Sequence, residues 1–184
     1  MSFQNQKKTF LAKSDKSKKG KIDREILPLI NKINNSENYY TTSSCAGRIV
    51  LLSKKSEKKQ DAGWLYTSHN KISFKQIKKA LAELPEADVW LRFEPLILHV
   101  ASDTIENAQK LINTARDLGF RKSGIQSTRK ILAEIASTEI LDTIVAKKGK
   151  LLITDSYLKI LIEEANKKLE RNKRKIREFY KNFQ

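Results

Sequence analysis

The sequence is poor in several kinds of residue, and each scarcity excludes a class of protein. One cysteine, Cys45, cannot form an intramolecular disulfide or build a thiolate metal site, and two histidines thirty residues apart make no metal cluster, so no metal is expected. No run of about 18 apolar residues occurs, which excludes a membrane-spanning helix. The N-terminal stretch also lacks the apolar core of a secretory signal. We therefore expect a cytoplasmic protein that binds no membrane.

Glycine is scarce and scattered, with six residues in the chain. As a result, neither the phosphate-binding loop G-x-x-x-x-G-K-[ST] nor the dinucleotide fingerprint G-x-G-x-x-G is present. The nucleophile elbow G-x-S-x-G is missing too. A cofactor, if the chain uses one, is therefore not held in the Rossmann manner. The 39% of apolar residues still predicts a packed core rather than a disordered chain.

Acidic residues are outnumbered, with 21 against 37 lysines and arginines, which gives a formal net charge of +16 and a pI near 9.9. The excess gathers at the two ends. Seven lysines and one acid lie between Lys7 and Lys21, and eight basic residues and two acids lie between Lys167 and Lys181. Clustered cations at such a pI favour a polyanionic partner, usually a nucleic acid. The alternative is a lysine-rich surface that is only well solvated.

Hydrophobic periodicity predicts an α+β fold. Between residues 64 and 136 the pattern runs strand, helix, strand, strand, helix, strand, which is typical of the split β-α-β unit of ferredoxin-like domains. Pro95 separates the two central strands, because proline cannot sit inside a regular ladder. Further strands predicted at 39–44, 48–53 and 150–154 should extend the same sheet. We expect one central mixed sheet with a split β-α-β core.

Helices are predicted to flank this sheet. Asp23 and Asp103 are expected to cap two of them, and Ser73 with Gln76 makes a capping box for a third. The last helix is long and basic and is expected to run to about residue 182. We predict a single domain at 1–184, with a basic N-terminal segment at 1–22 and a basic C-terminal helix extension at 170–184.

The densest group of polar residues lies in "YYTTSSCAGR", residues 39 to 48. A turn at Cys45-Ala46-Gly47 is predicted to join two strands, and its small residues expose backbone N–H groups. The hydroxyls of Ser43 and Ser44 add donors, and Arg48 adds a planar guanidinium suited to phosphate or carboxylate. This favours a cradle for a polar ligand. The alternative is a tight hairpin in which Cys45 is buried.

His69 ends the strand "WLYTSH", where an imidazole could act as a general base near neutral pH. Alternation predicts Trp64 on one face of this strand and His69 on the other. The alternative for His69 is a satisfied structural residue. His99 lies within an apolar run and is more typical of a core histidine. The polar loop "SDKSKKGKID" carries Asp15. The alternative for this loop is a solvated linker.

Six segments occur here in the order seen in one family. They are "SDKSKKGKID", "SSCAGRI", "WLYTSH", "FEPLILHV", "LGFRKSGI" and "ILAEIAST". From about Ser14 to Ser137 the chain thus resembles the tRNA wybutosine-synthesizing protein 3 family. The combination of "SSCxGR" with "W-x-x-x-x-H" and "FEP-x-x-x-HV" is the specific part of the resemblance. Ala46 stands where many relatives have serine and Ala136 where many have arginine, which argues against a ligand role at these two positions.

The resemblance implies an S-adenosylmethionine-dependent methyltransferase. Its substrate would be N4 of the tricyclic wybutosine precursor at position 37 of phenylalanine tRNA. In the active site, beside Ser44, His69 or Asp15 would accept the proton of this nitrogen. The expected cofactor contacts are Ser43, Ser44, Cys45, Gly47, Arg48, His99 and Ser102. The expected RNA contacts are Lys16, Lys18, Lys19, Arg171, Lys173 and Arg174.

Two other functions stay open at this point. A non-catalytic RNA-binding protein of the same fold would bind tRNA without affinity for S-adenosylmethionine. A hydrolase would need Cys45 and His69 within hydrogen-bond reach of each other, as nucleophile and base.

Overall fold

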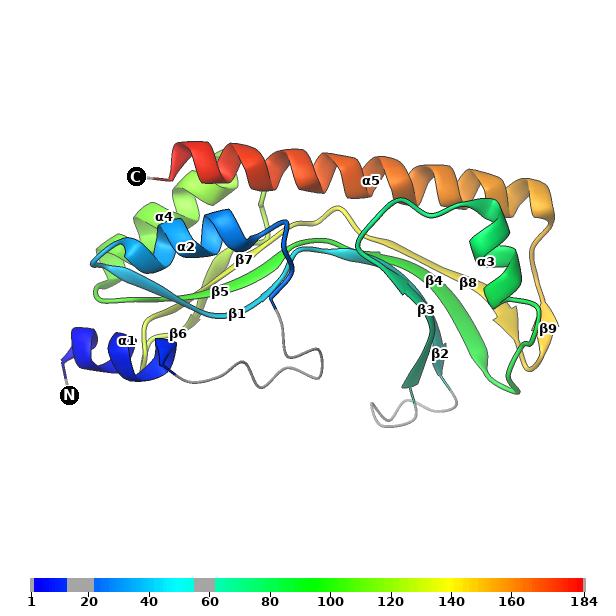
Figure 1. The fold of residues 1–184 in the computed structure, drawn as a ribbon, viewed down its shortest axis with the longest axis horizontal. Coiled ribbons are helices and arrows are strands. Elements are labelled where there is room, and N and C mark those ends of the chain that lie inside the picture. Colours follow the sequence, from blue (N-terminus) through cyan, green and yellow to red (C-terminus); the bar gives the residue numbers. More distant parts are fainter. Residues whose placement is uncertain (1, 13–21, 55–61, 184) are drawn as a thin grey trace. The chain divides into compact units, whose positions relative to one another are not determined.

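A computed structural model describes residues 2–12, 22–54 and 62–183 of the chain (Figure 1). The chain folds into two compact units, each built from segments far apart in the sequence. Unit 1 comprises Met1–Ala46, Leu96–Thr138 and Asn172–Gln184, and unit 2 comprises Gly47–Pro95 and Glu139–Arg171. The single domain expected over 1–184 stays a prediction. Among the described residues, no helix has the length and apolarity needed to cross a bilayer.

Unit 1 contains a four-stranded antiparallel sheet in the order β1-β5-β7-β6. Its strands are β1 (Tyr39–Cys45), β5 (Ile97–Ser102), β6 (Gly124–Ser127) and β7 (Leu132–Ala136). One face is covered by α2 (Leu27–Asn35), α4 (Ile105–Asp117) and the last turns of α5 (Asp155–Asn182), and α1 (Phe3–Leu11) lies against the other face (Figure 1). Phe3 and Phe10 hold α1 there, because their rings lie 5.4 Å from that of Tyr40.

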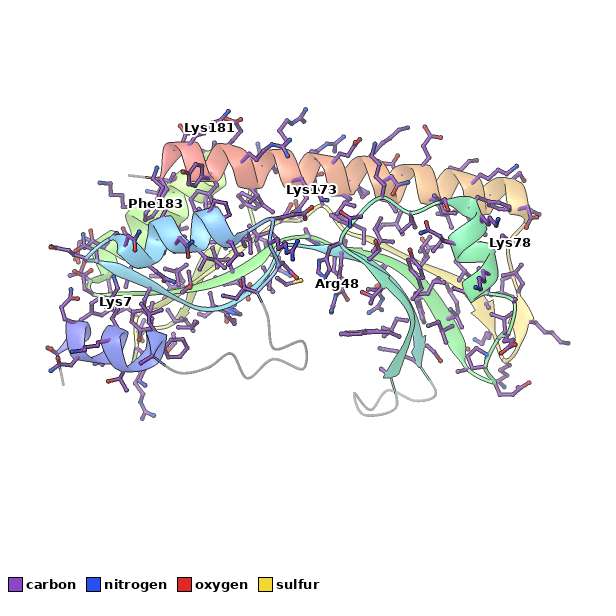
Figure 2. The ribbon with its side chains drawn as sticks, viewed as in Figure 1. Lys7, Arg48, Lys78, Lys173, Lys181 and Phe183 are labelled. Atoms are coloured by element: carbon purple, nitrogen blue, oxygen red, sulfur yellow. The ribbon has the colours of Figure 1, made fainter. Side chains whose placement is uncertain are left out.

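Apolar residues at helical spacing build the core of unit 1. α4 contributes the stripe that its sequence predicts, namely Ala108, Leu111, Ile112 and Ala115. The end of α5 adds Ile176 and Phe179, and Phe183, the residue that follows the helix, adds a further ring. Phe183 points toward the sheet and Lys181 points away from it (Figure 2). The basic end of α5 therefore contributes both surface charge and core aromatics to unit 1.

Unit 2 contains a five-stranded antiparallel sheet in the order β3-β2-β4-β8-β9. Its strands are β2 (Arg48–Lys54), β3 (Ala62–Ser68), β4 (Asp88–Glu94), β8 (Leu141–Lys147) and β9 (Lys150–Leu151). α3 (Phe74–Ala80) and the first turns of α5 pack on one face, where Ile77 and Leu158 join Leu51 in the core. The predicted capping box of Ser73 and Gln76 opens α3.

The α+β class is confirmed, and the fold is not a Rossmann sheet, because every strand pair among the described residues is antiparallel. The expected single mixed sheet is wrong, since the strands divide between two sheets. The division falls at Pro95 and Leu96, between β4 and β5. β4 pairs with β2 and β8, whereas β5 pairs with β1 and β7. Alternation along a strand predicts its buried face but not its neighbours, which is why the sequence did not show this division.

The predicted split β-α-β motif is present once in each unit. β2 runs antiparallel to both β3 and β4, so β3 and β4, which are joined through α3, run parallel on either side of it. In the same way β5 and β6, which are joined through α4, flank β7. The motif itself is confirmed, but the run 64–136, which was expected to build it within one sheet, is divided between the two sheets.

β1 and β2 do not form a hairpin, because they belong to different sheets. The chain leaves the first sheet at Cys45 and enters the second at Arg48. Between them Gly47 has a φ of 94°, a conformation that favours glycine over residues with a Cβ. The expected turn is thus a crossover between two sheets.

Neither aspartate caps a helix as expected. The side chain of Thr104 accepts the N–H of Asn107 at 3.1 Å and caps α4, so the cap lies one residue after Asp103. α2 begins after Ile26 with Pro28 in its first turn, so Asp23 lies ahead of the helix. The Asp23 side chain instead accepts a hydrogen bond from the N–H of Ala46.

Candidate active site

The backbone of Ala46 is held on both sides inside unit 1. Asp23 Oδ2 accepts the Ala46 N–H at 2.9 Å, and Asn172 Nδ2 donates to the Ala46 carbonyl at 2.8 Å. Asn172 Oδ1 also accepts the N–H of Leu96 at 2.9 Å. Ala46 and Leu96 are fully buried, and Asn172 is 4% exposed. One asparagine therefore holds the residue after β1 and the residue before β5. These contacts fix the end of β1, where Ser43 lies, beside the start of β5.

Ser43, His99 and Glu134 form a hydrogen-bonded row across three neighbouring strands of unit 1. Ser43 lies opposite His99 in the ladder, and His99 lies opposite Glu134. Ser43 Oγ is 2.7 Å from His99 Nδ1, and His99 Nε2 is 3.0 Å from Glu134 Oε2. Because a carboxylate only accepts, Nε2 carries a proton, and in the neutral form of the ring Nδ1 accepts from the serine hydroxyl. This hydroxyl–imidazole–carboxylate order can activate a hydroxyl or move a proton.

The row lies on the face of the sheet opposite the core of unit 1. His99 has 26% of its side chain exposed and Glu134 has 16%, so both are shielded but reachable. Cys45 follows Ser43 on the same face, because the two are separated by one residue in a regular part of β1. The structure thus brings together three predicted cofactor contacts, Ser43, Cys45 and His99.

Two other predicted residues of unit 1 lie apart from this row. Ser44 pairs with the buried Leu98, so it projects from the core-facing side of β1. Ser102 pairs with Tyr39 at the other end of the same two strands and is 4% exposed. The catalytic role expected of Ser44 and the cofactor contact expected of Ser102 stay predictions.

Arg48 begins β2 and lies on the side of this strand that is turned away from α5 (Figure 2). Its Nε donates to Glu94 Oε2 at 2.7 Å, and its guanidinium carbon lies 4.2 Å from the centre of the Trp64 ring. These two contacts hold the guanidinium in one orientation. Its remaining N–H donors suit a planar anion such as a carboxylate.

His69 follows β3, and its Nδ1 lies 2.9 Å from the carbonyl oxygen of Gly47. A carbonyl only accepts, so Nδ1 carries the proton and the neutral ring has its lone pair on Nε2. The predicted pairing of segments 48–53 and 64–69 is confirmed, with Ile49 opposite Ser68. Within unit 2, His69 therefore lies beside the residue that precedes Arg48.

A bulge in β3 overturns the strict alternation expected for "WLYTSH". Leu52 pairs with Trp64 whereas Leu51 pairs with Tyr66, so Leu65 is an extra residue in this strand. Trp64 therefore shares a face with Leu52 and Arg48, and Tyr66 lies on the core face. The contact between Trp64 and Arg48 follows from this shift of one residue.

The predicted residues of the basic ends are only partly described. Asp15, Lys16, Lys18 and Lys19 lie outside the described residues, and their roles stay predictions. On α5, Arg171 in unit 2 makes an ion pair with Glu139 at 3.1 Å, and Lys173 in unit 1 makes one with Glu25. Arg174 is exposed. The RNA contacts expected of Arg171, Lys173 and Arg174 also stay predictions.

Sequence reasoning missed two residues that organise unit 1. Asn172 stands in a lysine-rich segment and reads as a surface residue. Its place in the stripe between Leu169 and Ile176 is the signal that could have marked it as buried. Glu134 alternates with apolar residues of β7, which predicts a polar face, but only the strand register reveals His99 as its partner.

Comparisons with known proteins agree along nearly the whole chain. Residues 5–184 match the family described as Methyltransferase TYW3. The chain belongs to this methyltransferase family. It is 39% identical over 165 residues to tRNA(Phe) 7-((3-amino-3-carboxypropyl)-4-demethylwyosine(37)-N(4))-methyltransferase 1 of Pyrococcus abyssi, covering 88% of this chain and 85% of that protein. It is also 39% identical to the tRNA wybutosine-synthesizing protein 3 homolog of Bos taurus, covering 97% and 71%.

Solved structures share the fold of this TYW3 family member. The PH1069 protein from Pyrococcus horikoshii matches with a TM-score of 0.90 and 34% identity, covering 98% of this chain and 95% of that chain. A hypothetical protein from Aeropyrum pernix matches with a TM-score of 0.74 and 27% identity, covering 86% and 95%. The resemblance inferred from the six sequence segments is confirmed. Membership of a methyltransferase family implies that the chain works with a methyl donor.

Proposed function

We propose that this chain transfers a methyl group from S-adenosylmethionine to N4 of the tricyclic guanosine derivative at position 37 of phenylalanine tRNA. The observation that carries the proposal is the 39% identity, over 88% of the chain, to a protein whose name states an N4 transfer on tRNA(Phe). The net charge of +16 supports an RNA partner, because RNA backbones are held mainly by lysine and arginine. The cytoplasmic location expected from the sequence would suit such a substrate.

The chemistry of the donor groups fits S-adenosylmethionine. The guanidinium of Arg48 would hold the carboxylate of the cofactor, and the adjacent Glu94 carboxylate would suit its amino group. Gly47, which precedes Arg48, has no side chain and would let the cofactor approach its backbone. When bound, the cofactor supplies a methyl group already activated on a sulfonium. The protein then has to orient the acceptor nitrogen and remove its proton, and orientation supplies much of the acceleration.

The acceptor nitrogen loses a proton when its bond to the methyl carbon forms, and a base must take that proton. We assign this task to His99, acting through Ser43. The serine hydroxyl passes its proton to His99 Nδ1 as it receives the one from the substrate. The Glu134 carboxylate, at His99 Nε2, stabilises the imidazolium that results. After these two proton transfers Ser43 is again a hydroxyl, and the proton of the substrate is balanced by one on His99.

His69 is the second candidate for the base. Its Nδ1–H is held by the Gly47 carbonyl, so the neutral ring accepts a proton at Nε2. We favour His99 because the Glu134 carboxylate is hydrogen-bonded to its ring and stabilises the cationic form. Asp15 remains the third candidate.

The proposed function is tested by mass spectrometry of position 37. The full chain is incubated with S-adenosylmethionine and phenylalanine tRNA that carries the tricyclic base without its N4 methyl group. We expect one added methyl group at N4 that depends on both protein and cofactor. If tRNA binds but gains no methyl group, the chain is a non-catalytic RNA-binding protein, and the proposal fails.

Single-turnover methylation at saturating tRNA and cofactor separates the two histidines. His99→Ala should slow the chemical step by roughly 10²- to 10⁴-fold, the usual contribution of a positioned base. Glu134→Gln keeps a hydrogen-bond acceptor but removes the charge, so its loss should be smaller. His69→Ala should retain a rate close to that of the unchanged protein. A slow His69→Ala protein together with a normal His99→Ala protein would reverse the assignment.

A further inference from the structure

Both tryptophans of the chain lie on one face of the unit 2 sheet. The chain has two tryptophans, Trp64 on β3 and Trp90 on β4. Both pair with Leu52 of β2, from its two sides, so the three side chains share a face. This face is opposite the one that packs on α3 and α5, because Leu52 alternates with the core residue Leu51.

An arginine lies against each tryptophan ring. The guanidinium carbon of Arg48 is 4.2 Å from the centre of the Trp64 ring, and that of Arg92 is 5.6 Å from the centre of the Trp90 ring. Cation–π contacts of this kind hold the rings in fixed orientations. Trp64 is nevertheless 54% exposed, so a planar ligand can reach its ring.

A carboxylate neutralises each of these arginines. Glu94 accepts from Arg48 Nε at 2.7 Å, and Asp142 accepts from Arg92 Nε at 2.8 Å. Each of these two arginines is therefore balanced in charge by its own carboxylate partner. Phosphates would meet the two carboxylates and be repelled, whereas the faces of nucleobases are neutral. The edges of bases also carry N–H donors that can reach the carboxylates.

We propose that this tryptophan face, defined by Trp64, Trp90, Arg48 and Arg92, binds unpaired nucleobases of the tRNA by stacking. The choice of tRNA as the ligand rests on the proposed function. Unpaired bases are recognised by stacking on aromatic rings and guanidinium planes, and a protein with a net charge of +16 attracts the strand that carries them. The basic ends would hold phosphates, and the tryptophan face would hold bases.

Tryptophan fluorescence reports directly on the proposal, because both tryptophans lie on this face. In the full chain, Trp90→Phe leaves Trp64 as the only fluorophore, and Trp64→Phe leaves Trp90. Each protein is titrated with phenylalanine tRNA and with a fully paired RNA duplex, and filter binding measures the amount bound. Stacking should quench the fluorescence with tRNA and not with an equal amount of bound duplex.

Affinity provides an independent measurement. Trp64→Ala should weaken tRNA binding by roughly 5- to 150-fold, the size of one base–aromatic stack, and Trp64→Phe should keep most of the affinity. Tyr157→Ala is the matched control, since Tyr157 is an exposed aromatic on α5, which packs on the other face of the sheet. The affinity of the Tyr157→Ala protein for tRNA should not change. Thermal unfolding verifies that the three variants are folded.

Three outcomes would overturn the tryptophan face as a base-binding surface. The first is bound tRNA that quenches neither tryptophan, and the second is equal quenching by duplex. The third is that S-adenosylmethionine alone quenches both tryptophans as strongly as tRNA does, which would assign the whole face, and not only the edge at Arg48, to the cofactor. A protein whose tryptophans are quenched by tRNA but which transfers no methyl group would keep this inference and refute only the proposed function.

Discussion

Replacing Asn172 with alanine tests how the Ala46 backbone is held in unit 1. Asn172 is 4% exposed and serves two buried backbone groups, the carbonyl of Ala46 and the N–H of Leu96. Alanine would leave both groups without a partner, and each such loss costs about 1–3 kcal/mol. We therefore expect Asn172→Ala to lower the free energy of unfolding by roughly 2–6 kcal/mol, against a typical total of about 5–15 kcal/mol.

Two other asparagines serve as matched controls. Asn166 makes the same kind of double contact, with the N–H and carbonyl of Ile72, both at 2.9 Å, but its side chain is only half-buried. Asn182 donates to the Glu178 carbonyl at an exposed position. Water can replace a lost partner where the backbone is accessible. The loss of stability should therefore decrease from Asn172→Ala to Asn166→Ala to Asn182→Ala.

Circular dichroism in urea measures the global effect, because both tryptophans belong to unit 2 and would not report on unit 1. Hydrogen exchange at the Leu96 amide gives the local effect. Asn172→Asp keeps an acceptor for this amide but loses the donor to Ala46, so Leu96 should stay protected in the aspartate variant and lose protection in the alanine variant. An Asn172→Ala protein of unchanged stability, with a protected Leu96 amide, would refute the reasoning.

Three further predictions follow from the structure. Arg48→Ala should raise the dissociation constant of S-adenosylmethionine by about one to two decades, because a charged hydrogen bond contributes roughly 1.5–3 kcal/mol. Calorimetry measures this constant, and an unchanged value would show that the carboxylate of the cofactor binds elsewhere. Burial, with a smaller contribution from the Asp103 charge, raises the pKa of Tyr39 above its ordinary value of 10.0. The tyrosine therefore ionises first in the unfolded chain, and the free energy of unfolding should fall as the pH rises above 10.0. Tyr39→Phe should flatten that fall in urea titrations at alkaline pH, and an equally steep fall would exclude Tyr39 as its source. Truncation after Leu169 should unfold unit 1 despite the charge of the segment, because it removes the buried Phe179; a native circular dichroism spectrum would contradict this.

Features that depend on neighbours along the chain could be predicted from the sequence. The apolar stripe of α4, the capping box at Ser73 and the long final helix each depend on residues three or four positions apart. The α+β class followed from the alternation of strand and helix patterns. The family followed from six short segments in one order. Net charge and its clustering at the two ends are properties of composition alone, so they too needed no structure.

The partnerships of strands depended on the tertiary structure. Ser43 and His99 lie 56 residues apart and His99 and Glu134 lie 35 apart, and only the register of β1, β5 and β7 joins them. Trp64 reaches Arg48 because the bulge at Leu65 places its side chain on the face of the sheet opposite Tyr66. Alternation assigns a residue to a face of its strand, whereas neighbouring strands and bulges are selected by the packing of the whole chain. The sequence therefore determined which residues could carry chemistry, and the fold decided which of them meet.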